Sequence, residues 1–299
     1  MDPRKEDSRS LSTWMKNNGE DFYDWLVGFT DGDGNFYFAK TKKDSWTFSF
    51  KITQSSYNLR ALYHMKNIIG VGKVTISEPF ATYRVRDYNH IREYILPIFE
   101  KYPLLTSKYF EYVKFKKAIE IQSNSTLSSA EKNWYLEKLK NQEKILRASP
   151  ALENVGNQLK YKRKNWLVGF VEAEGSFYLT EKSKNRLVHG FEITKKSEEA
   201  LLLKIADLFE MKFYKKRTHY TVVTSKKDSI EKVITFFHKT MKGMKSLEYR
   251  IWARSFKKKD QSFEKLSAIV HLLRSIRSIR FDKNFCKIRP ESTLGPKGA

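Results

Sequence analysis

Four acidic residues occupy matching places in two parts of the sequence. Asp31 and Asp33 stand one residue apart in the first part, and Glu172 and Glu174 do so in the second. The helical spacing before them puts each pair in the last turn of a helix, where the helix dipole disfavours a carboxylate by about 0.3–1 kcal/mol. A divalent cation would compensate. In a chain of net charge +23, a site for metal and phosphate explains the acids better than a shared proton.

The acids belong to a duplicated segment. Residues 25–37 recur as residues 166–178, and at the same offset residues 50–53 recur as residues 191–194. Because the matches share one offset without a gap, they indicate two copies of one folding unit.

Small residues recur four apart on each predicted helix: Gly28 and Gly32 in the first copy, Gly169 and Ala173 in the second. Residues four apart share a helix face, so each helix offers a shallow stripe on which another backbone can pack. We expect the two helices to form a shared seam that brings Asp33 and Glu174 together. The glycines after the acids, Gly34 and Gly175, suit a left-handed helix cap.

The hydrophobic pattern in each copy predicts an α+β unit of order αββαββα. In the first copy we expect helices and strands at residues 21–33, 35–42, 46–53, 57–69, 73–77, 82–88, 91–101 and 108–122. In the second copy we expect them at 176–180, 187–194, 198–209, 212–217 and 220–224, with helices from Asp228 and Ser246 onward.

The domain organisation follows from the duplication. We expect a first half at residues 10–122 and a second half at 156–285, the latter with an extra C-terminal helix at 263–281. A linker at 123–155 is expected to hold a helix at 130–147 and to be broken at Pro150.

Composition excludes several classes of protein. The chain is 40% apolar and 30% charged, with 21 Phe and 16 Tyr, so wholesale disorder is excluded. Its one cysteine, Cys286, allows neither a disulfide scaffold nor a cysteine-rich zinc site. The polar start is not typical of a signal peptide and no segment is apolar enough to cross a membrane, so we expect a soluble, intracellular protein without a membrane partner.

The charge balance indicates a polyanionic partner. There are 57 Lys and Arg against 34 Asp and Glu, with a pI near 9.8. Neutralising phosphates releases counterions, so nucleic acid is the favoured ligand. There are two alternatives: the charge only maintains solubility, or the protein binds a membrane surface. The sequence shows no long basic amphipathic helix that would favour the membrane.

Within the duplicated segments, two nine-residue sequences resemble the motif of the LAGLIDADG homing endonucleases. They read LVGFTDGDG at residues 26–34 and LVGFVEAEG at 167–175, as in the monomeric, two-motif branch of that family. The resemblance implies two pseudo-symmetric αββαββα halves with the motif helices at the central interface. It also implies two four-stranded antiparallel sheets that form a saddle over the DNA major groove.

The resemblance also implies the metal site. Asp33 and Glu174 match the family's metal-binding acid, and the preceding carbonyls, of Gly32 and Ala173, can add ligands. Two or three Mg²⁺ ions are implied, which Mn²⁺ or Ca²⁺ can replace in binding. Each acid would serve one DNA strand, giving short 3′ overhangs. Glutamate in the second motif departs from the family, so we expect the two strands to be cut at unequal rates.

Further catalytic positions follow from the same resemblance. Gln54 matches the family's glutamine after the second strand, and its counterpart Lys195 is a departure. Lys108 and Lys245 match the lysine that opens a later helix, a role suited to a point charge near a phosphate. The family often has a basic or polar residue four beyond the glutamine; Asn58 and Glu199 stand at these positions, and we do not expect that role for them.

The faces of the strands opposite the core are expected to read DNA, because alternate side chains point to one face. Arg84 and Arg86 are candidates for bidentate contacts with guanine. The other candidates in the first half are Asn35, Tyr37, Thr41, Lys43, Ser49, Lys51, Lys73 and Thr75. Those in the second half are Ser176, Tyr178, Thr180, Lys182, Lys184, Lys215, Lys216 and Arg217. For each one, a solvated surface role is the alternative.

The resulting prediction is a monomeric, metal-dependent endonuclease that cuts double-stranded DNA at a long asymmetric site. The alternatives are an intron maturase that binds its host intron RNA, a catalytically silent DNA-binding protein of the same fold, and a generic basic RNA-binding protein. The last of these does not explain the repeated acids. Richness in Lys, Asn and Tyr suits an AT-rich organelle genome, so a mitochondrial location is expected.

Overall fold

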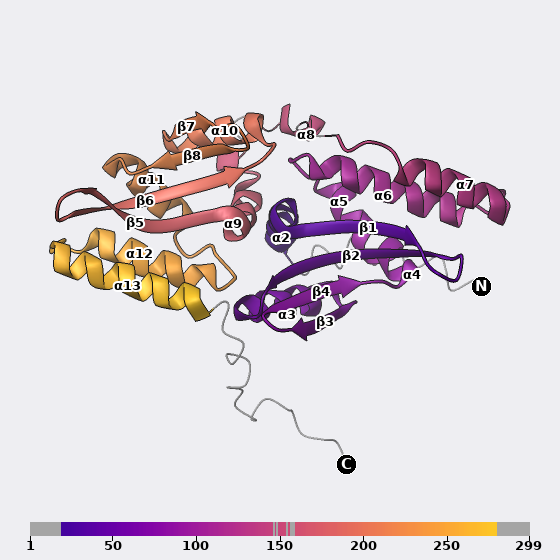
Figure 1. Cartoon of the computed structure of the whole chain (residues 1–299), viewed down its shortest axis with the longest axis horizontal. Helices are drawn as coiled ribbons and strands as arrows, with labels where there is room; N and C mark the ends of the chain where they lie inside the picture. Colours follow the sequence, from indigo (N-terminus) through magenta and orange to yellow (C-terminus); the bar gives the residue numbers. More distant parts are fainter. Residues whose placement is uncertain (1–18, 146, 148, 154, 156–158, 280–299) are drawn as a thin grey trace, which may run out of the picture.

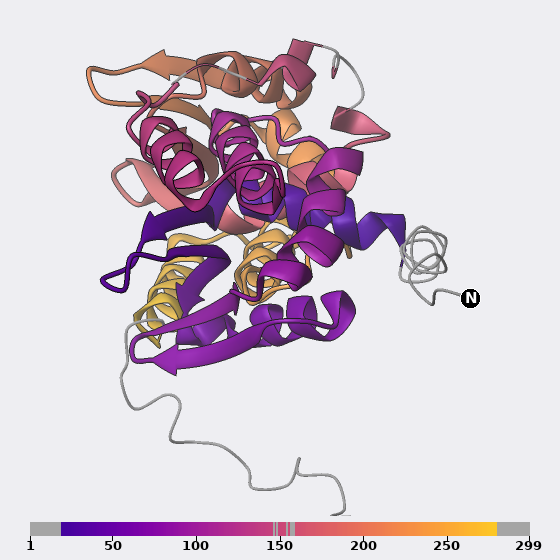
Figure 2. The same ribbon diagram turned by 90° about the vertical axis from the view of Figure 1, so that its right-hand side faces the viewer.

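The computed structural model describes residues 19–145, 147, 149–153, 155 and 159–279. The predictions for Cys286 and for the outer ends of the two halves, residues 10–18 and 280–285, lie outside these residues. The described chain forms two lobes. Helices α2 (Glu20–Asp33) and α9 (Lys164–Glu174) lie side by side between two β-sheets, as Figure 1 and the turned view in Figure 2 show.

The first lobe has the predicted order of elements. After α2 it contains β1 (Gly34–Lys40), β2 (Trp46–Ser55), the 3-10 turn η2 (Ser56–Asn58), α3 (Leu59–Ile69), β3 (Lys73–Ser77), β4 (Phe80–Val85), α4 (Tyr88–His90), the π-turn η3 (Ile91–Ile95), α5 (Leu96–Lys101) and α6 (Lys108–Ser123). The four strands form an antiparallel sheet of order β1-β2-β4-β3. The predicted αββαββα unit is confirmed.

The second lobe repeats this plan. After α9 it contains β5 (Gly175–Ser183), β6 (Arg186–Lys195), α10 (Glu199–Phe209), β7 (Lys212–Lys215), β8 (Tyr220–Thr224), α11 (Lys227–Phe237) and α12 (Lys245–Lys257), with sheet order β5-β6-β8-β7. The first strand runs beyond its predicted end at residue 180. The third ends before its predicted end at 217, so Lys216 and Arg217 lie in a turn.

Several strand boundaries of the first lobe differ from the prediction by one to three residues, most at β4. The sequence predicts a strand at residues 82–88, but β4 covers Phe80–Val85. The strand stops because Asp87 caps the next helix, where its side chain accepts a hydrogen bond from the His90 backbone N–H at 2.9 Å. The helix that follows is interrupted by a π-turn just ahead of Pro97, which has no backbone N–H to donate.

The linker contains a helix that belongs to the first lobe. Helix α7 (Ser129–Lys140) packs on α6, buries Leu136 and Leu139, and begins at a capping box formed by Ser128 and Glu131. It ends before the predicted residue 147 because residues 141–144 are polar and exposed and offer nothing to bury. Pro150 opens the short helix α8 (Pro150–Glu153) instead of only breaking the chain.

Helices α7 and α13 occupy corresponding places in the two lobes. The predicted C-terminal helix is present as α13 (Phe263–Ile279), which packs on α12 and against β5 and β6. In the same way α7 packs on α6, which contacts β1. The helix in the linker and the "extra" C-terminal helix are therefore one repeated element. In the described part of the chain, no helix is long and apolar enough to span a bilayer.

The seam between the lobes depends on the small residues. A Cβ added to Gly28 would overlap the backbone carbonyl of Trp166, and one added to Gly169 would overlap the carbonyl of Trp25. The two helix backbones therefore touch where no side chain intervenes. The predicted seam is confirmed.

Candidate active site at the helix seam

The seam brings Asp33 and Glu174 to one place. They end α2 and α9, and both are partly exposed. A Cβ on Gly32, the residue before Asp33, would lie 3.5 Å from the Glu174 Oε1 atom. Burial raises the pKa of Asp33, and the nearby charge of Glu174 raises it further. Two carboxylates from different lobes thus share one electrostatic environment, as the sequence predicted.

The glycines that follow the acids are not left-handed caps. Gly34 has φ −75° and ψ 160°, and Gly175 has φ −74° and ψ 152°, both extended. A side chain at Gly34 would overlap Thr30, and one at Gly175 would come within 2.6 Å of Val171 Cγ1. Glycine stands here because each strand leaves its helix at once and passes close to the preceding turn.

The other two acids, Asp31 and Glu172, face the interior. Asp31 accepts hydrogen bonds from the Leu105 N–H at 2.8 Å and from the indole N–H of Trp166, in the other lobe, at 2.8 Å. Glu172 accepts from the Gly243 N–H at 2.7 Å and from the indole of Trp25 at 3.3 Å. Hydrogen bonds from within each lobe and across the seam stabilise this pair of acids, and the positive charges of Lys108 and Lys245 add to them.

The two predicted lysines also lie at the helix ends. Lys108 donates to the carbonyls of Gly34 at 2.6 Å and Gly32 at 3.0 Å. Lys245 donates to the carbonyl of Gly175 at 2.6 Å and contacts that of Ala173 at 3.5 Å. Each ammonium therefore offsets the negative end of a motif helix.

This arrangement has two consequences. Burial lowers the pKa of Lys108, and the positive charge of Lys195 lowers it further. The carbonyls of Gly32 and Ala173, predicted as metal ligands, are next to lysine amines, so their metal role stays a prediction.

The two seam acids have different polar partners. The Gln54 side-chain amide donates to Asp33 at 2.6 Å, whereas the Lys195 ammonium forms an ion pair with Glu174 at 2.7 Å. The repeat thus places a neutral donor beside one carboxylate and a cation beside the other. Both residues predicted from the motif reach the site.

Sequence reasoning missed a second pair, Asn58 and Glu198. Asn58 donates to Gln54 at 3.0 Å and accepts from the Met244 N–H at 3.0 Å, one residue before Lys245. Glu198 accepts from the Ser107 N–H, one residue before Lys108, at 3.0 Å. Each lobe therefore holds the start of the other lobe's lysine-bearing helix.

A signal for this pair exists in the sequence. Buried Leu62 corresponds to buried Leu202, so the repeat offset falls by one residue after Gln54. The counterpart of Asn58 is therefore Glu198, and not Glu199, which the constant offset indicates.

The donor set fits a hard divalent cation. Asp33 and Glu174 supply carboxylate oxygens at a partly exposed site where their mutual repulsion favours a positive charge. Within the described residues, no group of three or more His, Cys, Asp or Glu side chains could hold a metal ion. Two carboxylates leave most coordination positions open, which suits ligands from water and phosphate.

The strand register places four predicted residues in one row across the first sheet. Asn35 pairs with Lys51, Lys51 with Arg84, and Arg84 with Lys73, all on the face opposite the core. Phe36 and Tyr83, on the other face, are buried. The buried Arg84 Nε and Asn35 Oδ1 atoms have no hydrogen-bond partner among the described residues. This row therefore gathers polar and basic side chains on the face that was predicted to read DNA.

The remaining candidates of this lobe lie at several places. Tyr37 and Thr75 are exposed on the sheet face, Thr41 and Lys43 lie in the turn after β1, and Arg86 follows β4. Ser49 has the predicted orientation but is only 6% exposed, so it is not accessible as expected. Its register partner is the large side chain of Tyr37.

The corresponding row of the second sheet has a different character. Ser176 pairs with Glu192, Glu192 with Val223, and Val223 with Lys212. Glu192 and Lys212 were not predicted, although the alternation of β6 and β7 could have indicated them. The hydroxyl of Tyr178 donates to Glu192 at 3.4 Å. The two sheets therefore present unlike surfaces.

One predicted residue of the second sheet lies on the wrong face. Lys215 pairs in register with Tyr220, on the side covered by α10, and its amine lies 3.3 Å from Glu199. β7 continues the alternation from Lys212, which puts Lys215 on the opposite face. Lys182 was also predicted to face DNA, but it lies where the β5–β6 register shifts, between Glu181 and Ser183, and it lines a hollow together with residues of α11 and α12. The other candidates, Thr180, Lys184, Lys216 and Arg217, are exposed on the strands or their turns.

Comparison with known proteins places these observations in context. The family model described as LAGLIDADG endonuclease matches residues 26–119 and 167–256. A Schizosaccharomyces pombe protein named probable intron-encoded endonuclease Cox1-I1b is 41% identical over 86% of this chain and 69% of its own length. The Saccharomyces cerevisiae uncharacterized mitochondrial protein RF1 is 32% identical over 63% of this chain.

The chain spans only part of several relatives: 39% of RF1, and 64% of a Neurospora crassa protein named probable intron-encoded endonuclease 2, which is 27% identical. Solved structures share the fold. The LAGLIDADG meganuclease I-AabMI bound to uncleaved DNA has a TM-score of 0.71 at 22% identity, covering 85% of this chain and 98% of its own. I-SmaMI, bound to uncleaved DNA with calcium ions, has a TM-score of 0.67 at 22% identity, covering 86% and 97%.

Proposed function

The chain belongs to the LAGLIDADG endonuclease family, and from that premise we propose that it is a site-specific endonuclease that cuts both strands of a long, asymmetric duplex DNA site. The observation that carries the proposal is the pair of carboxylates, Asp33 and Glu174, brought together at the seam from two lobes. Each stands at the inner end of a sheet whose open face carries polar and basic side chains.

The seam residues have distinct parts in this reaction. Asp33 and Glu174 would hold Mg²⁺, which supplies an activated water and charge stabilisation at the scissile phosphates. Lys108 and Lys245, whose ammonium groups lie at the ends of the two motif helices, would offset negative charge that builds at the cleaved bonds. One carboxylate for each DNA strand would give a double-strand break, for which the family resemblance implies short 3′ overhangs.

The two sheets would bind the two halves of the site. Alternating side chains on their open faces suit base contacts in the major groove, and the lysines suit phosphates. The first sheet presents Asn35, Lys51, Arg84 and Lys73, whereas the second presents Ser176, Glu192, Val223 and Lys212. Unlike rows read unlike half-sites, so one monomer recognises an asymmetric target.

Two further features of the proposal rest on the relatives. Several are named as intron-encoded, and one is named as mitochondrial. We therefore propose that the chain comes from an intron of an organelle genome and acts in the mitochondrion, with its host intron RNA as a second partner. A catalytically silent DNA-binding role is less favoured, because both acids and both lysines reach the site.

Selection from a random duplex library with Mg²⁺ tests the proposal. Cleaved molecules are captured by their overhangs and sequenced. We expect one long consensus without internal two-fold symmetry and with short 3′ overhangs. If no duplex is cut, or if the consensus is palindromic, the proposed function fails.

A further inference from the structure

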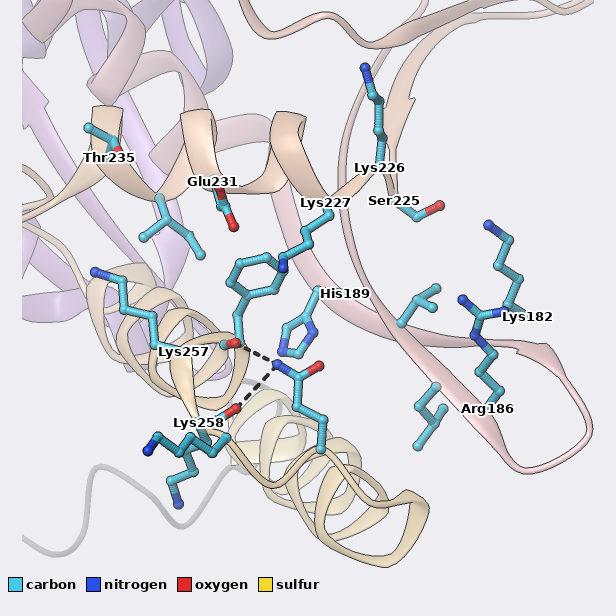
Figure 3. A pocket seen from close by; sticks show the side chains of 16 residues that line it. Lys182, Arg186, His189, Ser225, Lys226, Lys227, Glu231, Thr235, Lys257 and Lys258 are labelled. Atoms are coloured by element: carbon cyan, nitrogen blue, oxygen red, sulfur yellow. Dashed lines mark hydrogen bonds between the residues drawn. The ribbon is translucent and has the colours of Figure 1, made fainter.

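Two adjoining hollows lie on the helix-covered side of the second lobe. The first has a volume of about 1020 Å³ and lies between the β5–β6 hairpin, the start of α11 and the end of α12 (Figure 3). Among the described residues, seven Lys and Arg side chains line it, and Glu231 is the one acidic lining residue. Figure 3 shows Lys182 and Arg186 on the hairpin, Lys226 and Lys227 at α11, and Lys257 and Lys258 at the end of α12.

The second hollow continues the first along α12. It has a volume of about 550 Å³ and shares Ile234 and Lys257 with the first. Arg250, Arg254 and Lys257 have the spacing of one helix face, and all three are exposed. None of the described residues that line this hollow is acidic. We call the surface formed by Arg250, Arg254 and residues 257–259 the cationic band.

The described residues provide no acidic partners for the charges of the band. Among the described residues, no carboxylate lies within 4.0 Å of the charged groups of Arg250, Arg254 or the lysines at 257–259. Concentrated charge of one sign repels itself and attracts a polyanion. The surface therefore has the electrostatics of a binding site for phosphates.

The repeated unit alone does not explain the band. Taking Lys108 and Lys245 as equivalent, the places of Arg250, Arg254 and Lys257 are held on α6 by Val113, Lys117 and Glu120. A hollow beside α6 mixes acidic and basic side chains, and within it Lys144 forms an ion pair with Glu111 at 2.5 Å. Of the two corresponding helix faces, that of α12 is basic at all three places and that of α6 is mixed.

The band lies on the side of the sheet away from the proposed DNA surface. His189, buried in the floor of the first hollow, alternates along β6 with Gly190, which pairs with Tyr178 on the open face. A rigid duplex on the open face cannot also enter hollows behind the same strands. The occupant is therefore a different chain or a flexible one.

We propose that the cationic band binds the sugar–phosphate backbone of a single-stranded nucleic acid while the open sheet faces hold duplex DNA. A basic groove that follows the backbone is the usual means of binding single strands. The assignment of the open faces to duplex DNA rests on the proposed function, whereas the charge and shape of the band do not.

Fluorescence anisotropy with unstructured single-stranded RNA and single-stranded DNA of equal length tests the proposal. The band variant carries Arg250→Gln, Arg254→Gln and Lys257→Gln. A matched control, with Lys117→Gln, Lys138→Gln and Lys140→Gln, removes the same charge from exposed helix positions of the first lobe. A second variant, Lys258→Gln with Lys259→Gln, tests the other end of the band.

We expect the band variant to lose single-strand affinity on the order of tenfold, and its log–log salt slope to fall by about 2, since each phosphate contact contributes about 0.7. The control and duplex cleavage should be unaffected. Equal loss in the control, no single-strand binding by the wild type, or loss of duplex binding in the band variant would overturn the proposal. A difference between the affinities for RNA and for DNA would indicate a contact with the ribose hydroxyl. Equal affinities would indicate contacts with phosphate alone. Both outcomes support the proposed band.

The same experiment separates the two proposals. If the protein binds the single strand at the band but cuts no duplex, the band proposal is supported and the proposed endonuclease function fails.

Discussion

Asp33 and Glu174 occupy equivalent places but are surrounded by different partners. The amide of Gln54 contacts one carboxylate and the ammonium of Lys195 contacts the other. An ion pair holds its carboxylate more strongly than a neutral amide does. The two lobes therefore differ at the residue scale in the groups that would orient the metal-binding oxygens.

This difference predicts separable effects on the two strands. Lys195→Met removes the cation beside Glu174, and Gln54→Leu removes the amide beside Asp33. We expect each variant to slow cleavage of a different strand by about 10- to 100-fold, as for other groups that orient metal ligands. Duplexes with a different label on each strand measure the two rates. Slowing of the same strand by both variants would contradict the account.

The sequence predicted the site residues of this scale unevenly. The family resemblance pointed to Gln54, Lys108, Lys195 and Lys245, and the structure places all four beside the motif helix ends. From charge and spacing alone, Asp31 and Asp33 looked alike. Residues two apart on a helix point in directions about 200° apart. Asp31 therefore faces the interior contacts of the seam, and Asp33 faces the partly exposed site. Which direction is interior depends on the partner helix, which the sequence of one helix does not contain.

At the scale of elements, the seam is defined by close backbone contact. Gly28 and Gly169 each meet a tryptophan carbonyl of the opposite helix. Asp31 and Glu172 then bind tryptophan indoles across the same interface. The spacing of small residues predicted the contact, but the crossed hydrogen bonds depend on the angle between the helices.

Gly28→Ala is expected to separate the motif helices. The added methyl has no space beside the Trp166 carbonyl, and overpacking of this kind costs about 1–3 kcal/mol or more. Ala173→Gly, on the same seam, should cost only about 1 kcal/mol. Denaturant unfolding measures both. A Gly28→Ala protein as stable as the Ala173→Gly control would refute the close contact.

His189 makes the stability of the second lobe sensitive to acid. Burial lowers the pKa of His189 to about 4 from its model-peptide value of 6.5. The unfolded chain then binds a proton that the folded chain does not, so stability is lost as pH falls from about 6.5 towards 4. The full shift corresponds to about 3 kcal/mol.

His189→Phe should remove this part of the acid sensitivity while keeping a ring against Trp252 and Phe256. Unfolding free energies of both proteins between pH 7 and pH 4.5 measure the difference. Equal losses in the wild type and the variant would show that His189 is not buried in its neutral form.

The whole molecule combines two copies of one fold with two unlike surfaces. The repeat was visible in the sequence because its motif helices and inner strands are constrained by the seam and the core. A shift of one residue in the repeat offset hid Glu198, and the β7 register hid the orientation of Lys215. Both depend on how separate elements meet, so neither followed from local spacing.

The role of the open sheet face in DNA binding can be tested by comparing a substitution there with one on the covered face of the second sheet. Arg84→Gln should weaken duplex binding by about 1–3 kcal/mol and relax the consensus at one position, because Arg84 lies between Lys51 and Lys73 in the row across the open face of the first sheet. Lys215→Gln, on the covered side beside Glu199, should change affinity by less than about twofold. Equal effects would contradict the assignment of the faces.

The most direct test of the central claim is cleavage of the selected duplex by Asp33→Asn and Glu174→Gln, with binding measured in parallel with Ca²⁺. Both variants keep the size of the side chain and remove its charge. We expect cleavage with Mg²⁺ to fall by about 10³-fold or more, or to stop at a nick, while duplex affinity is kept. Cleavage of both strands at the wild-type rate by either variant would show that the seam carboxylates are not the catalytic metal ligands.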